Sequence, residues 1–219
     1  MKNSDHIDNG IVNIDINEII DDLPVKYVNG ITDETKIDLI EKYFREIMRV
    51  LGLNIENESL KDTPRRVAKM YVKEMFRGLN ADNKPSISVF NNDYKYDHMV
   101  IERNITLYST CEHHFVPIVG KVNIGYYPNG HVIGLSKLNR IVQYFAKRPQ
   151  QQERLTVQIS KEIMNVLNTN DVAVFIEADH LCVKSRGIKD VNSNTVTSSY
   201  NGKFLNEAIR SEFLIALKG

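Results

Sequence analysis

The sequence lacks net charge, long apolar runs and internal repeats. Its 219 residues hold 28 Lys and Arg against 28 Asp and Glu, so the chain as a whole has no general attraction for nucleic acid or an anionic membrane surface. No apolar run approaches the roughly 20 residues that span a bilayer, and the acidic, Asn-rich start is unlike a signal peptide. We therefore expect a cytoplasmic protein that binds neither nucleic acid nor membrane.

Cysteine is also scarce, since Cys111 and Cys182 are the only two. In a reducing compartment such residues are more often free thiols or metal ligands than a disulfide. The charge is balanced overall but unevenly distributed. Residues 1–33 hold seven acids against two lysines, a net of −5, which leaves +5 on residues 34–219. This positive excess suits an anionic small molecule as ligand.

Residues 1–33 are predicted to form an acidic, mobile arm, because they are polar apart from one short amphipathic segment. That segment ends before Pro24 and carries four apolar residues at helical spacing, Ile16, Ile19, Ile20 and Leu23. A solvated tail without a function is the simpler interpretation of this arm.

Residues 34–80 are predicted to form a helical region with two helices. The second, "DTPRRVAKMYVKEMFRGL", has Thr63 as a candidate N-cap, Pro64 at the first helical position and Gly78 at its end. The first stops at Gly52. Its apolar residues recur at intervals of three and four and are Ile37, Ile40, Phe44, Ile47 and Leu51.

Residues 81–219 are predicted to form an α+β domain. Four short β-rich runs come first, "SISVF", "MVIERNITLYS", "IVGKVNIGYYP" and "HVIGL". Two amphipathic helices follow, one in "SKLNRIVQYFAKRP" and one after Pro149. A further strand is expected in "DVAVFIEADHLCVKS" and a final helix around Asn206 to Leu217. This order favours an antiparallel sheet covered on one face by helices.

The stretch "STCEHHFVP" places Cys111, an acid and two histidines at consecutive positions. A Cys and a His three apart can bind one ion, but two ligands do not make a stable zinc site. The other cysteine lies in "DHLCV", where the two-residue period of a strand would put His180, Cys182 and Lys184 on one face. Both cysteines therefore lie beside histidines, which favours a shared metal. A buried pair of thiols is the alternative.

The number of ligands decides the kind of metal site. Structural zinc takes four protein ligands, whereas catalytic zinc takes three and keeps a position for water. Cys111, His114 and Cys182 would make three and leave His113 and His180 for proton transfer. The spacing also allows a closed site in which His180 or His113 is the fourth ligand. No H-E-x-x-H is present, nor the H-x-E and P-C-x-x-C pairing of nucleotide deaminases.

The sequence contains several longer motifs, "TPRRVAKMY", "STCEHHFVPIVGKV", "GLSKLNRIVQYFAKRPQQQERLT", "HLCVKSRGIKD" and "SNTVTSS". Together they resemble GTP cyclohydrolase I of the zinc-dependent, C-E-H-H type. They stand in family order, with nearly family spacing, from about Asp62 to the C-terminus. One departure is Ser185, where alanine is common in the family. Residues 1–33 match nothing in the family pattern, which leaves a regulatory role for the arm open.

The resemblance implies an enzyme that converts GTP and water to formate and 7,8-dihydroneopterin triphosphate, the first step of pterin and tetrahydrofolate synthesis. Guanine C8 is hydrated, the ring is opened and deformylated, and the ribose rearranges and closes. Zn²⁺ on the three ligands named above would lower the pKa of a bound water from about 15.7 towards about 7. The catalytic residues implied are His113, His180 and Ser136, and histidines titrate in the range that the proton transfers need.

The resemblance also implies residues for the two ends of GTP. Lys137 and Arg140 follow Ser136 at the start of a helix, where backbone N–H groups favour an anion. Glu153 suits the N1–H and 2-amino group of guanine. The full set of substrate-binding residues implied is Glu153, Gln152, Leu135, Lys137, Arg140, Arg186, Arg66 and Lys69.

The fold implied is the tunnelling fold, a four-stranded antiparallel sheet with two helices packed on one face, here preceded by N-terminal helices. In the family such sheets join into a ring, and two pentamers stack into a homodecamer with active sites between subunits. Two other interpretations stay open. One is another purine- or pterin-handling enzyme of the same fold. The other is a non-catalytic oligomeric binding protein with a closed structural zinc.

Overall fold

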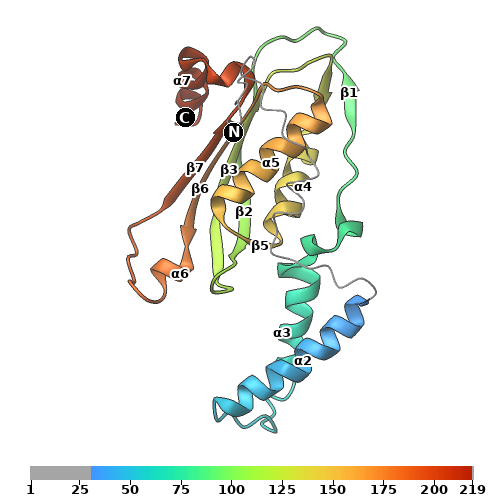
Figure 1. Cartoon of the computed structure of the whole chain (residues 1–219), viewed down its shortest axis with the longest axis vertical. Coiled ribbons are helices and arrows are strands. Elements are labelled where there is room, and N and C mark those ends of the chain that lie inside the picture. Colours follow the sequence, from blue (N-terminus) through green and yellow to red (C-terminus); the bar gives the residue numbers. More distant parts are fainter. Residues whose placement is uncertain (1–30, 219) are drawn as a thin grey trace, which may run out of the picture. The chain divides into compact units, whose positions relative to one another are not determined.

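Two helices begin the part of the chain that the computed structural model describes, residues 31–218 (Figure 1). Helix α2 (Asp33–Val50) starts where the Thr32 side chain accepts a hydrogen bond from Thr35 N–H. It ends just before Gly52, whose φ of 77° suits glycine. Helix α3 (Thr63–Met70) packs against α2. The predicted arm lies outside the described residues except for residues 31–33, and so does its amphipathic segment.

The second helix differs from the prediction at both ends. Its N-cap is Asp62 instead of Thr63, and beyond Met70 the α-helix gives way to one π-helical turn and two 3-10 turns. These turns are η1 (Tyr71–Met75), η2 (Arg77–Leu79) and η3 (Ala81–Asn83). Gly78, expected as a stop, lies inside η2, where its N–H donates to Lys147 O at 2.8 Å. Gly78 is therefore a point of close approach to the following helix pair.

A five-stranded sheet carries the fold, in the order β5-β2-β3-β6-β7. Its four long strands are antiparallel neighbours, β2 (Val100–Cys111), β3 (Pro117–Tyr126), β6 (Val172–His180) and β7 (Thr195–Tyr200). The four antiparallel strands implied by the family resemblance are therefore present, and a fifth strand, β5 (Pro149–Gln150), pairs with β2 in parallel. A two-residue strand gives no periodic signal in the sequence.

The strand assignments differ from the prediction in two further places. "SISVF" and "HVIGL" contain β1 (Val89–Asn91) and β4 (His131–Ile133), which pair only with each other as a separate two-stranded sheet. Strand β7 was not predicted, because its Thr- and Ser-rich sequence lacks alternating apolar residues.

Helices α4 (Leu135–Ala146) and α5 (Gln152–Leu167) lie on one face of the large sheet (Figure 1). They bury their apolar faces against alternate strand residues such as Leu107, Val122 and Val174. This confirms the predicted helix pair. The apolar residues that recur at helical spacing in these two segments are all buried, namely Leu138, Ile141, Val142, Phe145, Leu155, Ile159, Ile163 and Leu167.

A smaller cluster covers the opposite face at one end of the sheet. Phe204 of η4 (Gly202–Leu205) and Phe213 of α7 (Glu207–Ala216) pack with Ala173. The Asn206 side chain caps α7 by accepting from two backbone N–H groups. The predicted final helix is therefore confirmed. Among the helices in residues 31–218, none has the length and apolar character needed to cross a bilayer.

Candidate active site

The turn between β2 and β3 holds the C-E-H-H motif. Its backbone closes through Phe115 N–H to Cys111 O and Cys111 N–H to Val116 O, both at 2.9 Å. Phe115 takes a positive φ of 53°, and its ring packs on Phe76 with centroids 5.1 Å apart. Glu112 N–H donates to Gln150 O at 3.1 Å. The turn is thus tied to β5 and to the N-terminal helical segment.

The pairing of β3 with β6 brings the other cysteine to this turn. Ile118, just after the turn, lies opposite His180, the last residue of β6. The chain then forms the single-turn helix α6 (Leu181–Lys184), which carries Cys182. The prediction that His180, Cys182 and Lys184 share one face of a strand is therefore wrong. Cys182 reaches the turn because the strand ends before it.

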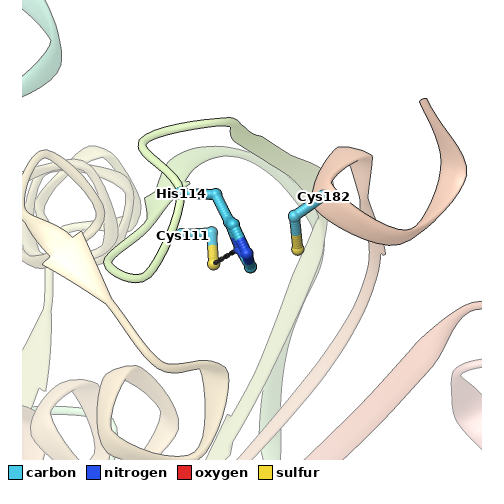
Figure 2. Close-up of side chains that lie close together, drawn as sticks. All are labelled: Cys111, His114 and Cys182. Atoms are coloured by element: carbon cyan, nitrogen blue, oxygen red, sulfur yellow. Dashed lines mark hydrogen bonds between the residues drawn. The ribbon is translucent and has the colours of Figure 1, made fainter. Parts of the chain in front are cut away.

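Three side chains converge at this end of the sheet (Figure 2). One ligand atom from each of Cys111, His114 and Cys182 lies within 4.8 Å of the others, and Cys111 Sγ is 3.9 Å from His114 Nδ1. Zinc–sulfur and zinc–nitrogen bonds of about 2.3 and 2.0 Å let one ion bridge such a pair. Among the described residues, no fourth donor joins this group.

The proximity of the two cysteine sulfurs also favours a cation between them. Burial, and then the neighbouring Cys111 sulfur, raise the pKa of the Cys182 thiol. Two adjacent thiolates repel each other unless a positive charge lies between them. Thiolate is the form in which cysteine binds a metal. Two sulfurs and one imidazole are the ligand types that a soft or borderline metal ion such as Zn²⁺ prefers.

His180 is held in one orientation by Gln152. The Gln152 Nε2 group donates to Thr195 O at 3.0 Å and to Ile176 O at 3.3 Å, so its Oε1 faces His180 Nε2 at 2.7 Å. Because Oε1 can only accept, the proton must reside on Nε2 of His180. Burial lowers the pKa of His180, against the smaller opposing charges of Glu153 and Asp179. His180 is therefore neutral near pH 7, with the lone pair on Nδ1.

His113 lies on the exposed side of the turn. Its Nδ1 is 3.9 Å from Cys111 Sγ, and its Nε2 is 3.8 Å from Glu112 Oε1. Glu112 forms an ion pair with Arg154, and both side chains are largely buried, at 14% and 16% exposure. Arg154 also donates to Pro149 O at 3.2 Å. Sequence reasoning gave Glu112 and Arg154 no role, although both lie inside the motifs that it singled out.

The predicted substrate-binding residues near the metal donors are Glu153, Gln152 and Arg186. Glu153 is exposed in the first turn of α5, close enough for its charge to act on the pKa of His180. Arg186 is exposed just beyond α6, and its charge acts on the pKa of Cys182. Gln152 is 1% exposed, and its amide makes hydrogen bonds within the chain. It orients His180, and its contact with substrate stays a prediction.

The residues at the start of α4 lie elsewhere in the same chain. Ile133 N–H, just before α4, donates to Tyr126 Oη at 3.4 Å, so this helix begins beside the Tyr126 end of β3. The metal donors lie at the other end of that strand, which has 10 residues and therefore a length of about 30 Å. Three of the predicted residues are placed in this way, Leu135, Ser136 and Lys137. Arg140 lies midway along α4, which runs back beside β2 until Ala146 O accepts from Ser109 Oγ.

Arg66 and Lys69, the last two predicted residues, are exposed on α3. Arg66 forms an exposed ion pair with Asp62 at 3.4 Å. Of the predicted site residues, the structure thus brings together within one chain only the metal donors, the two histidines, Gln152, Glu153 and Arg186.

Comparison with known proteins shows the family of this chain. The sequence matches the GTP cyclohydrolase I family over residues 40–218. It is 55% identical to GTP cyclohydrolase 1 of Flavobacterium johnsoniae over 188 residues, covering 86% of this chain and 84% of the relative. It is 52% identical to the Histophilus somni protein of that name over 180 residues, covering 82% and 83%. For the Pasteurella multocida protein of that name the identity is 53% over 176 residues, covering 80% and 81%. The chain belongs to the GTP cyclohydrolase I family.

Proposed function

We propose that this chain catalyses the reaction for which its family is named, converting GTP and water to formate and 7,8-dihydroneopterin triphosphate. The observation that carries the proposal is the convergence of Cys111, His114 and Cys182 beside a neutral, oriented His180. Relatives that are more than half identical over most of the chain have the name of this enzyme. The reaction opens the pathway to pterins and tetrahydrofolate.

We propose Zn²⁺ as the metal, with Cys111, His114 and Cys182 as its ligands. The separation of the donors and their two sulfurs and one imidazole support this choice. With three protein ligands, such an ion leaves a coordination position for water and lowers that water's pKa, which supplies a nucleophile near neutral pH for guanine C8.

His180 and His113 would move the protons that the reaction requires. The hydrogen bond to Gln152 fixes the His180 ring and directs its basic Nδ1 away from Gln152. That nitrogen can take a proton from a reacting group and return it at another atom. His113 is exposed at the same turn and can exchange protons with solvent. Ser136 is the third residue proposed for catalysis, and it comes from the other end of the fold.

GTP recognition would need side chains from both ends of the fold. Glu153 is placed to accept hydrogen bonds from guanine N1–H and the 2-amino group, with Arg186 nearby for phosphate. Leu135 and Lys137 lie at the far end of the sheet, and Arg140 lies further along the same helix, so we propose that a neighbouring copy supplies them. Arg66 and Lys69 on α3 would add further cationic contacts.

We propose that the sheet has the tunnelling fold and that copies of it join into a ring, two pentamers stacking into a decamer. Two features support this. Helices α4 and α5 cover one face of the sheet and leave its two edges accessible to partners. Within residues 31–218, β5 pairs with only Thr110 and Cys111 of the 12-residue β2, so most of that edge offers unpaired backbone groups.

The test is incubation of purified protein with GTP, with and without a chelator. We expect formate and a product that becomes a fluorescent pterin on oxidation, both lost when the metal is removed. Release of a different product would favour another purine- or pterin-handling enzyme of the same fold.

Two variants test the division between ligands and proton carriers. His113→Ala and His180→Ala should each lower turnover by at least about 100-fold while the protein keeps its metal, measured by elemental analysis. Loss of metal in step with activity would make these histidines ligands and the open, three-ligand site wrong. A metal retained without any turnover in the unaltered protein would favour a structural zinc.

A further inference from the structure

A polar pocket lies between α4 and the turns η2 and η3, away from the metal donors. Its volume is about 340 Å³. Its polar lining comes from Asn139, Arg140, Gln143 and Tyr144 on the helix and from Arg77 and Asn83 on the turns. A pocket of this size is at the small end for ligand sites. It suits phosphate groups better than a complete nucleotide.

The charge in this pocket is unbalanced. Among the described residues, neither Arg77 nor Arg140 has a carboxylate within ion-pair distance. The pKa of nearby Lys147 is lowered, first by burial and then by the charge of Arg77, with Glu74 opposing. Two guanidinium groups that share a pocket without a counter-ion create a positive potential that attracts anions.

The pocket is also built rigidly. Gly78, next to Arg77, donates to Lys147 O and accepts from Arg148 Nε, each at 2.8 Å. A Cβ at Gly78 would stand 2.2 Å from Tyr144 O, so only glycine permits this approach to α4. The Arg77 carbonyl in turn accepts from Asn83 Nδ2 at 2.8 Å. The backbone that carries Arg77 is therefore fixed relative to Arg140, which reduces the entropy that binding must overcome.

The neutral side chains add hydrogen-bond donors. Asn83, Asn139 and Gln143 each donate one hydrogen bond to a backbone carbonyl. An amide NH₂ carries two hydrogens, so each has a second to offer. Guanidinium forks with amide donors around them match the tetrahedral oxygens of a phosphate group.

We propose that this pocket binds phosphate groups of the substrate and that Arg77 is a phosphate-binding residue alongside Arg140. The proposal rests on the proposed function, in which Arg140 binds the triphosphate of GTP. It extends the phosphate site beyond α4 to the turn η2.

The test compares Arg77→Ala and Arg77→Lys with the unaltered protein. Binding of inorganic triphosphate is measured by calorimetry, and KM and kcat are measured with GTP. We expect Arg77→Ala to weaken triphosphate binding and raise KM by about tenfold, with kcat changed by less than about twofold. Arg77→Lys should retain part of the binding, because lysine keeps the charge without the fork.

Lys84→Ala is the matched control. It removes the same charge from the same segment, but Lys84 Nζ binds Glu162 at 2.9 Å and does not line the pocket. We expect it to leave triphosphate binding unchanged. If Lys84→Ala weakened triphosphate binding as much as Arg77→Ala, the loss would reflect the net charge of the protein and not a specific site in the pocket.

Three further outcomes separate this proposal from the proposed function. Unchanged triphosphate binding in a folded Arg77→Ala protein overturns the pocket. Weaker triphosphate binding with an unchanged KM for GTP places the anion outside the substrate site and overturns the assignment to substrate. No formate from the unaltered protein, together with Arg77-dependent triphosphate binding, contradicts the proposed function and supports the anion pocket.

Discussion

At the scale of single residues, Gln152 shows how a buried amide can decide the chemistry of a neighbour. Its Nε2 is committed to carbonyl oxygens of Ile176 and Thr195, so only its oxygen can face His180. The His180 tautomer follows from that commitment. The family resemblance implies a substrate contact for Gln152. Its burial at 1% exposure and its hydrogen bond to His180 indicate that it also has a positioning role.

Replacing Gln152 by leucine tests this role. Gln152→Leu removes the acceptor that holds His180, so the ring can rotate away from its working orientation. We expect kcat to fall by about tenfold or more, with KM for GTP changed little. The substitution also leaves buried carbonyl oxygens without a hydrogen-bond donor, which should lower the free energy of unfolding by about 1–3 kcal/mol.

Thr197→Val is the control for the stability effect alone. Thr197 Oγ1 lies 3.1 Å from Gln152 Nε2 and makes a hydrogen bond with Thr156, but it does not touch His180. This variant should be destabilised by a similar amount and keep most of its turnover. Equal losses of kcat in the two variants would mean that Gln152 acts through general packing and not through His180.

At the scale of elements, the β2–β3 turn depends on one ion pair with α5. Arg154 joins Glu112 of the turn to Pro149 O of β5, so three segments meet at one guanidinium. A charge that is largely buried is costly once its partner is removed. This pair therefore fixes the turn that presents Cys111 and His114.

Arg154→Met should loosen that turn. Removal of a residue that positions metal ligands without binding the metal itself typically lowers metal affinity by about 10–100-fold. We expect a loss of about that size for Zn²⁺, measured by competition with a chelator. The double variant Glu112→Gln/Arg154→Met should recover part of the lost unfolding free energy, because it leaves no lone charge.

Arg45→Met provides the comparison for an ordinary ion pair. Arg45 pairs with Glu41 at 3.3 Å along α2, with both side chains more exposed. We expect a cost of at most about 0.5 kcal/mol and no change in metal affinity. Zinc affinity unchanged in Arg154→Met would show that the turn keeps its shape without the pair.

The same elements show what the sequence could and could not predict. Helices α4 and α5 were predicted because their apolar residues repeat at the helical period, a local signal. The placement of Cys182 was wrong because alternation in "DHLCV" resembles a strand, whereas the chain turns into α6 after His180. The meeting of the two cysteines depends on the β3–β6 register, with Ile118 opposite His180. A pairing between segments so far apart in sequence leaves no local pattern.

At the scale of the whole molecule, the candidate site is divided between the two ends of the sheet. The metal donors and His180 lie at one end of β3, and α4 begins near the other. The roles of Lys137 and Arg140 stay predictions. About 30 Å of strand separates the first turn of α4, with Lys137, from the metal donors, so a second copy must bring Lys137 to the metal if it binds substrate. Arg140 lies further along α4, which runs back beside β2 towards Ser109.

This division predicts complementation between inactive variants. His180→Ala damages the metal end and Arg140→Ala the α4 end, so each homo-oligomer should have little activity with GTP. When the two are unfolded together and refolded as mixed oligomers, a site between copies can combine one intact metal end with one intact α4 end. With random mixing, about a quarter of the sites should be intact in both parts, and activity should recover to about that fraction of the unaltered protein.

The double variant His180→Ala/Arg140→Ala, mixed with an equal amount of unaltered protein, controls for refolding. If the site lies between copies, about a quarter of the sites in this mixture combine two intact ends. If each chain contains a complete site, half of the sites are intact. Sites contained within one chain would give no recovery in the first mixture, because every chain there carries one damaged end. Formate release from the two mixtures thus distinguishes a site shared between copies from a site contained in one chain. If the activity of the first mixture never exceeded that of the single variants, the division of the site between copies would be contradicted.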